Sequence, residues 1–222
     1  MQTPVNQQAE PPVRQRVRIR FCKQGDLRLI GHRDLVRAME RLFRRAELPL
    51  GMSQGFHPKP RMSFPAALAV GIEGLDEVME IELTQQVTAE ALLRQLTAWS
   101  IPGLDFHHVE VLPTVGKARK ARVTRMTYQI AVAAERRNEV ATRAAELLEC
   151  RSFPIQRPNG LQSIDLLEFL EALELSKETL SMTLRVTQQA NPGPRDVLRA
   201  LGLVNLERQG ACLRRTQVEV RA

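Results

Sequence analysis

Two neighbouring stretches of the sequence concentrate side chains suited to binding an anion. The first is GHRD at positions 31–34, where His32 precedes a predicted helix start at Asp34. The second is SQGFHPKPR at positions 53–61, in which prolines on both sides of Lys59 restrict the backbone. A helix N-terminus offers free N–H groups, and lysine and arginine add full positive charges. We therefore expect these two stretches to form an anion site.

The same residues also have a purely structural interpretation. In that interpretation His32 orders its own loop through hydrogen bonds, and Gln54 satisfies backbone groups of the second stretch. The sequence has no GxxxxGK[ST], GxGxxG or HExxH pattern, so it does not support P-loop, dinucleotide-binding or zincin chemistry.

A metal or cluster site is not predicted. The three cysteines, Cys22, Cys150 and Cys212, have neither CxxC nor CxxxCxxC spacing. The adjacent His107 and His108 fall on a predicted strand, where neighbouring side chains point to opposite faces. We expect no metal and no cofactor on this chain.

Positive charge is unevenly distributed along the 222 residues. The chain has a net charge of +7, yet residues 13–65 hold 13 Lys and Arg against 4 Asp and Glu, and residues 116–125 add five bases without an acid. Such a polarised field attracts a polyanion such as RNA through counterion release. The alternative is a solvated surface with incidental asymmetry. No apolar run reaches membrane-helix length and no signal peptide is visible, which predicts a cytoplasmic protein without a membrane partner.

Residues 13–22 and 34–47 predict a strand and a helix that each have one basic face. In the strand, Val17, Ile19 and Phe21 alternate with arginines. In the helix, apolar residues from Leu35 to Ala46 recur every three or four positions and leave an arginine stripe on the opposite side.

The order of elements predicts an α+β fold of two tandem ferredoxin-like (βαββαβ) halves with antiparallel sheets. After the first strand and helix come strands at 62–70, 77–83 and 104–112 and a helix at 88–99. The weaker second half has strands at 127–133 and 179–186, helices at 136–149 and 194–201, extended or mixed structure at 153–156 and 165–175, and a closing hairpin at 206–220. A helix at 161–173 is the alternative for the mixed region. The domains expected are a disordered lead-in (1–12), a first domain (13–113), a basic linker (114–126) and a second domain (127–222).

Basic and polar residues from these segments are the candidates for binding RNA or a partner. They are Arg16, Arg18, Arg20, Lys23, His32, Arg37, Arg41, Arg44, Arg45, Ser53, Gln54, His57, Lys59, Arg61, Lys117, Arg119, Lys120 and Arg122.

Residues 20–64 resemble the signature of the radical-SAM-linked protein family. The resemblance rests on the strand and turn RFCKQG, the helix start HRDL, the paired arginines at 44 and 45 and the loop SQGFHPKP. The chain departs from the pattern at Gly31, Arg33 and Met52, where the family usually has serine, an apolar residue and an aromatic.

The resemblance implies a partner. Family members are encoded beside, or fused to, radical SAM proteins with a cobalamin-binding domain, and some lie near ribonuclease E/G-type or ribosomal-protein genes. Since this chain lacks a cluster motif, we expect a non-catalytic accessory protein of such an enzyme, which binds RNA or presents an RNA or ribosomal substrate through its basic surface.

Two other functions fit the same residues. One is a metal-free endoribonuclease, similar in architecture to the CRISPR repeat-processing enzymes, with His32 or His57 as general base and Lys59 or Arg61 stabilising the phosphorane. The other is a protein-interaction module that docks on the radical SAM partner without nucleic acid.

Overall fold

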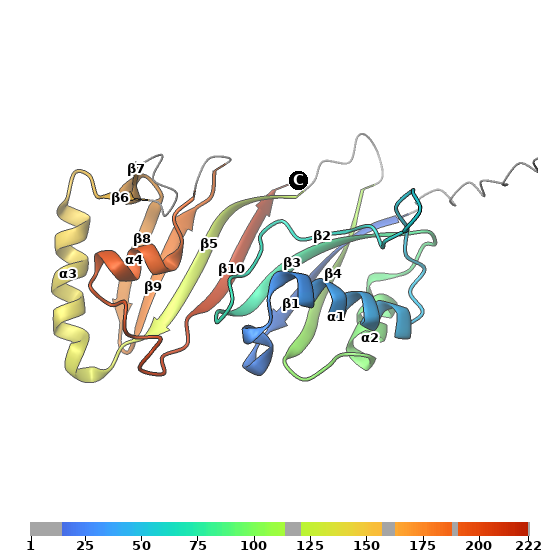
Figure 1. Cartoon of the computed structure of the whole chain (residues 1–222), viewed down its shortest axis with the longest axis horizontal. Coiled ribbons are helices and arrows are strands. Elements are labelled where there is room, and N and C mark those ends of the chain that lie inside the picture. The colour runs from blue at the N-terminus through green and yellow to red at the C-terminus, as the bar shows by residue number, and fades with distance from the viewer. Residues whose placement is uncertain (1–14, 114–120, 157–162, 188–190, 222) are drawn as a thin grey trace, which may run out of the picture.

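A computed structural model describes residues 15–113, 121–156, 163–187 and 191–221. It is a mixed α+β structure in which four α-helices accompany a mostly antiparallel sheet (Figure 1). The predicted α+β class is therefore confirmed. The lead-in 1–12 and residues 114–120 of the predicted linker lie outside the described residues.

The first half of the molecule comprises β1 to β4 and contains the two stretches, 31–34 and 53–61, that were predicted to form an anion site. Its elements are β1 (Gln15–Lys23), α1 (His32–Arg45), β2 (Met62–Ser63), β3 (Glu73–Leu83), α2 (Ala89–Ala98) and β4 (Leu104–Leu112). The strands lie in the order β4-β1-β3, with the short β2 on the other side of β3, and all these pairs are antiparallel. The strand predicted at 104–112 has the bounds of β4.

The second half comprises β5 to β10. Its elements are β5 (Arg122–Ala131), α3 (Arg137–Glu149), β6 (Pro154–Gln156), β7 (Ser163–Asp165), β8 (Leu170–Ser176), β9 (Thr179–Arg185), α4 (Pro194–Ala200) and β10 (Arg214–Arg221). Here the strand order is β10-β5-β9-β8, again antiparallel, while β6 and β7 form a separate hairpin.

The two halves share one continuous sheet. Strand β10 pairs in parallel with the beginning of β3, Arg214 opposite Glu73 and Arg215 opposite Gly74, which joins the strands into an eight-stranded sheet. The structure thus differs from the expected pair of separate sheets. In Figure 1, β5 and β10 lie between the α3 end of the molecule and the end that carries α1 and α2.

Each half has its own hydrophobic core. In the first half α1 and α2 contribute Leu35, Met39, Leu92 and Leu96 to a cluster that includes Phe21 of β1. In the second half α3 and α4 pack with β5, β8 and β9. Burial of these apolar faces is the main stabilising contribution of the helices.

Several sequence predictions of element bounds need correction. The strand predicted at 62–70 is limited to β2, and the strand predicted at 77–83 begins at Glu73. The alternative helix at 161–173 is not formed, because residues 163–173 contain β7, a short 3-10 turn and the beginning of β8. Strand β5 begins at Arg122, five residues before the predicted start, so Arg122 belongs to a strand and not to a linker. The predicted closing hairpin at 206–220 is a turn region followed by the single strand β10, because the strand's partners are β5 and β3. Helix α1 begins at His32 with Gly31 as N-cap, and Asp34 lies in its first turn.

Candidate functional site

Helix α1 presents one apolar face to the core and one basic face to solvent, as the sequence predicts. Leu35, Met39, Leu42 and Phe43 are buried. The exposed positions carry the predicted arginine stripe of Arg37, Arg41, Arg44 and Arg45, and also Arg33. The helix positions His32 at its first residue, where the ring meets Phe64 edge-on with 5.2 Å between ring centroids.

The segment 51–61 is attached to the sheet edge by backbone hydrogen bonds. Gly51 donates to the Glu82 carbonyl (2.7 Å), and Glu82 in turn donates to the Arg61 carbonyl (3.1 Å). The Arg61 guanidinium donates to the Met52 carbonyl (2.9 Å) and pairs with the Glu82 carboxylate (3.2 Å). Arg61 therefore orders the base of the loop, whereas the structural interpretation of the sequence assigned such a role to His32 and Gln54.

The upper part of the segment is a narrow loop closed across its neck. Ser53 N–H donates to the Lys59 carbonyl (2.8 Å), and Lys59 N–H donates to Ser53 Oγ (2.9 Å). Residues 54–59 are exposed beyond this neck, with Gly55 at φ +128°, a conformation suited to glycine. The Lys59 side chain is left outside the loop's own hydrogen bonds.

An open groove of about 700 Å³ lies between helix α1 and this loop. Its lining residues come from the whole length of α1 and from residues 48–60: His32, Arg33, Val36, Arg37, Glu40, Arg44, Leu48, Leu50, Met52, Pro58, Lys59 and Pro60. Four cations and a histidine thus face one carboxylate. The structure brings together His32, Arg37, Arg44 and Lys59 of the predicted site residues.

Most of the groove's cations are not neutralised. Arg37 pairs with Asp34 at 3.4 Å, and both side chains are well exposed, so this ion pair is weak. Among the described residues, Arg33, Arg44 and Lys59 make no side-chain ion pair. A negatively charged ligand would therefore not have to displace a carboxylate from them.

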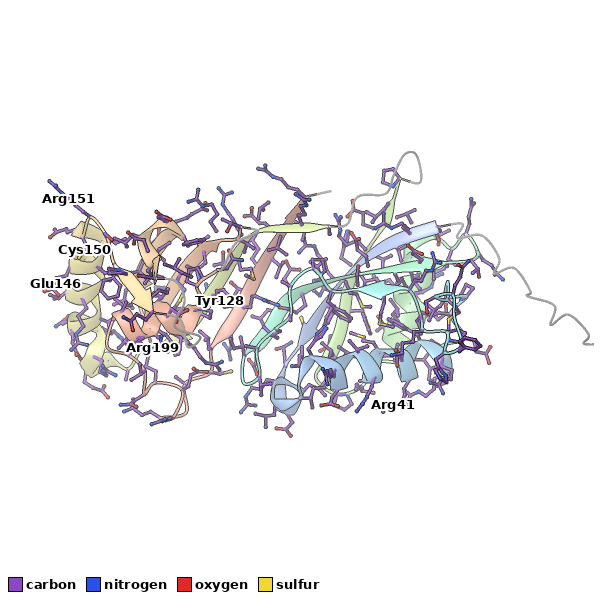
Figure 2. The ribbon with its side chains drawn as sticks, turned by 45° about the horizontal axis from the view of Figure 1, so that its top comes forward. Arg41, Tyr128, Glu146, Cys150, Arg151 and Arg199 are labelled. Atoms are coloured by element: carbon purple, nitrogen blue, oxygen red, sulfur yellow. The ribbon has the colours of Figure 1, made fainter. Side chains whose placement is uncertain are left out.

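A second, smaller groove of about 400 Å³ lies on the other flank of α1. Arg41, Arg44 and Arg45 line it together with Ile101. The Arg45 guanidinium lies 5.4 Å from the centre of the half-exposed Trp99 ring and donates to its carbonyl. Figure 2 shows Arg41 extending from α1 away from the sheet. Arg44 lines both grooves, so positive charge continues around the helix.

The predicted basic face of β1 is internally neutralised. Arg16 and Arg18 pair with Glu80 of β3 at 3.0 and 2.9 Å, and Arg18 also pairs with Glu110 of β4. Arg20 pairs with Asp76 of β3. These arginines compensate acidic residues on neighbouring strands and have less charge to offer a phosphate.

Lys23, at the end of β1, is buried and donates to the Ile30 carbonyl at 2.8 Å. Burial lowers the pKa of its ammonium, which nearby Arg215 also lowers and Glu77 partly restores. The lysine holds the turn after β1 and does not reach the groove.

The remaining predicted site residues lie outside the groove. Ser53 closes the loop neck, while Gln54 and His57 are exposed near its tip. Arg122 is exposed at the start of β5. Lys117, Arg119 and Lys120 fall outside the described residues.

A GxSxG pattern at residues 51–55 (GMSQG) is a signal that the sequence reasoning missed. In α/β-hydrolases this pattern marks a strand–turn–helix elbow that exposes a nucleophilic serine. Here the pattern lies in the loop, no helix follows it, and Ser53 Oγ accepts the Lys59 hydrogen bond. The structural context of a nucleophile elbow is therefore lacking.

Sequence reasoning also missed a row of three side chains in contact across neighbouring strands: Asp76 of β3, His107 of β4 and Cys22 of β1. Cys22 Sγ lies 3.9 Å from His107 Nδ1, and His107 Nε2 lies 3.1 Å from Asp76 Oδ1. Burial, together with the charges of Asp105 and Asp76, raises the pKa of the Cys22 thiol. A raised pKa disfavours the thiolate, so this arrangement does not suit nucleophilic chemistry.

Two further structural findings concern metals and membranes. Within the described residues, no three His, Cys, Asp or Glu side chains are grouped so as to hold a metal ion. No helix in that part of the chain has both the length and the apolar character needed to cross a bilayer.

A family model described as "Uncharacterized protein conserved in bacteria (DUF2344)" matches residues 16–194. The chain belongs to this family. The DUF2344 match extends from β1 to the beginning of α4 and so includes both walls of the larger groove. The link to radical SAM proteins stays a prediction.

Comparisons with curated proteins and with solved structures do not indicate a function. No curated protein matches the chain. A solved structure of an unknown protein from Galdieria sulphuraria aligns with 94% of this chain and 99% of its own, at 14% identity and a TM-score of 0.28. A similarity this weak carries no argument about fold or function.

Proposed function

We propose that this protein is a non-catalytic accessory that binds RNA through the groove between α1 and residues 48–60. The observation that carries the proposal is the set of cations in that groove, of which Arg33, Arg44 and Lys59 have no ion-pair partner among the described residues. Phosphates are the ligands that such a cluster attracts, and they are bound with release of counterions.

The dimensions of the groove favour an extended ligand over a compact one. The positions from His32 to Arg44 on α1 span about 18 Å at the helical rise of about 1.5 Å per residue. Successive phosphates of a nucleic-acid strand match a row of cations of this length, whereas a single small anion would occupy one part of it.

The proposed partner is a radical SAM protein with a cobalamin-binding domain, and this part rests on the resemblance of residues 20–64 alone. The accessory would hold RNA or an RNA-containing substrate while the partner carries out the chemistry.

We also infer that the two halves are ferredoxin-like units. In each half, helices follow the first and third strands of a β-α-β-β-α-β order, and the strands lie in the spatial order 4-1-3-2. In the first half the second strand is reduced to β2, and in the second half the β6–β7 hairpin is inserted after α3. The halves would then be repeats joined edge to edge through β3 and β10.

The experiment is an RNA-binding titration by fluorescence anisotropy at several salt concentrations. We expect Arg33→Ala/Arg44→Ala/Lys59→Ala to weaken binding and to reduce the slope of log affinity against log salt by about 2, because each lost contact to a single strand removes about 0.7. The matched control, Arg151→Ala/Arg208→Ala/Arg221→Ala, removes three exposed charges outside the groove. We expect it to keep nearly the wild-type slope.

Two results would contradict the proposal. One is wild-type protein that binds no RNA at low salt. The other is an equal loss of affinity in both triple variants, which would indicate a general charge effect. The endoribonuclease remains the second candidate because His32 and Lys59 line the same groove. Metal-free RNA cleavage that disappears in His32→Ala would favour it over the accessory role.

A further inference from the structure

The loop above the groove carries a phenylalanine whose position folding does not explain. Phe56 is 103% exposed and is the most exposed large apolar side chain among the described residues. Burying an apolar side chain stabilises a fold, so the exposure of Phe56 forgoes a contribution to stability. A fully exposed aromatic ring at a loop tip is therefore available to a ligand.

The loop geometry holds this ring away from the body of the protein. The two hydrogen bonds between Ser53 and Lys59 and the bridge between Met52 and Pro60 close the loop below the tip. Gly55, immediately before Phe56, has φ +128°, a backbone conformation that favours glycine. Pro58, two residues further on, lines the groove, so the loop tip that carries Phe56 begins two residues from the groove wall.

The surroundings of Phe56 favour a nucleic-acid ligand over a protein pocket. The groove below it contains Lys59 and the row of arginines on α1, with Glu40 as the one carboxylate among the lining residues. An apolar ring beside unneutralised cations complements a strand that offers a base and phosphates together. Aromatic stacking with basic contacts is the combination by which proteins bind single-stranded nucleic acid.

We propose that the ligand is single-stranded RNA, whose phosphates lie along the α1 groove while one unpaired base stacks on Phe56. The inference rests on the proposed RNA-binding function and specifies its substrate class. In a duplex the bases are stacked on one another inside the helix, and a phenyl ring at a loop tip reaches only an unpaired base. An RNA loop or end meets the same requirement.

The test compares affinities for a single-stranded RNA dodecamer and for the same sequence as a duplex, measured by anisotropy with full-length protein. We expect Phe56→Ala to weaken single-strand binding about five- to 150-fold, the equivalent of about 1–3 kcal/mol of stacking. The salt slope should not change, because no charge is removed. Duplex binding should be weaker in the wild type and insensitive to the substitution.

Conservative variants distinguish stacking from general apolar contact. Phe56→Trp should retain or improve single-strand affinity, whereas Phe56→Leu should behave like Phe56→Ala. All three variants should have the melting temperature of the wild type, because the Phe56 ring is fully exposed.

The outcomes separate this inference from the proposed function. RNA binding that depends on the groove cations but is unchanged in Phe56→Ala would overturn the stacking inference alone, as would equal affinity for both RNAs. Unchanged RNA binding with lost association to the radical SAM partner would overturn it in favour of a protein contact. Absence of all RNA binding would overturn both.

Discussion

The arginines of β1 and those of α1 have different roles because their neighbours differ. Arg18 on β1 is flanked by Glu80 and Glu110 from the adjacent strands, and the three side chains form a buried to half-buried network. Arg41 on α1 has no such partner among the described residues and extends into solvent (Figure 2). Opposite charges across neighbouring strands stabilise a sheet, so the arginines of β1 serve the fold. Those of α1 remain available to a ligand.

At the residue scale, we predict a large loss of stability for one substitution on α1 and almost none for another that lies two positions away. Phe43→Ala should lower the free energy of unfolding by about 3–5 kcal/mol, because Phe43 is fully buried in the first-half core. Arg41→Ala should change it by no more than about 0.5 kcal/mol, because its side chain is exposed. Urea denaturation of both variants measures these differences. If Arg41→Ala were as destabilising as Phe43→Ala, the assignment of the two faces would be wrong.

Among the elements, β3 connects the parts of the molecule. It pairs with β1, β2 and β10 and so belongs to both halves of the sheet. At its beginning, Glu73 accepts hydrogen bonds from Gly25 N–H and from Arg214, both at 3.1 Å. Burial opposes ionisation of Glu73, but these hydrogen bonds outweigh it and lower its pKa below the ordinary 4.5. The carboxylate therefore links the turn after β1 to β10.

The lowered pKa gives an element-scale prediction for Glu73→Gln. The folded-state pKa is below the unfolded one, so ionised Glu73 stabilises the fold above about pH 4.5, and this contribution is lost as pH falls through the folded-state value. We expect the variant to be less stable than the wild type by about 1 kcal/mol near neutral pH, and the difference to shrink below about pH 4.5. Thermal unfolding across this range measures it.

Glu174→Gln is the matched control, because Glu174 is exposed on β8 and makes no ion pair among the described residues. Near neutral pH it should unfold with the wild type. A deficit of Glu73→Gln that stayed constant down to about pH 3 would show that the loss does not come from the ionised carboxylate.

The molecule as a whole is joined by a buried ion pair. Arg215 of β10 is 2% exposed and donates from Nε to Glu77 of β3 at 2.7 Å, with a second bond from Nη2. It also donates to the carbonyls of Ala66 and Ala67. Burial by itself would lower the pKa of Arg215, but its bonds to Glu77 raise it, so the guanidinium stays charged. This pair fixes the junction at which β10 meets β3.

At the scale of the whole molecule, we predict that Arg215→Met destabilises both halves together. Removing one partner leaves the Glu77 carboxylate buried and unpaired, which costs about 3–5 kcal/mol. Glu77→Met/Arg215→Met should recover part of the loss, because both charges are then absent. The exposed neighbour Arg214, changed to Met, should cost no more than about 1 kcal/mol.

Two signals separate the halves in this experiment. Trp99, the single tryptophan, reports on the first half by fluorescence, and far-UV circular dichroism reports on both halves. We expect the two denaturation curves to coincide in the wild type and to move together in Arg215→Met. A shift confined to the dichroism curve would contradict a shared folding unit.

The sequence by itself determined what depends on neighbours along the chain. The alternation of Val17, Ile19 and Phe21 correctly predicted strand β1, and the helical period of residues 34–47 correctly predicted the two faces of α1, because side-chain periodicity is a local property of strands and helices. His32 and Lys59, which the sequence suggested as parts of one site, both line the groove between α1 and the loop.

Only the tertiary structure decided which charges are free and how the halves are joined. The alternating arginines of β1 resemble a basic surface until the strand register places Glu80, Asp76 and Glu110 beside them. The pairing of β10 with β3 joins positions that are 141 residues apart, Glu73 and Arg214, and no local pattern specifies it. Register and long-range pairing arise from burial and hydrogen bonding of the whole sheet, and this is why they are not visible in any one segment.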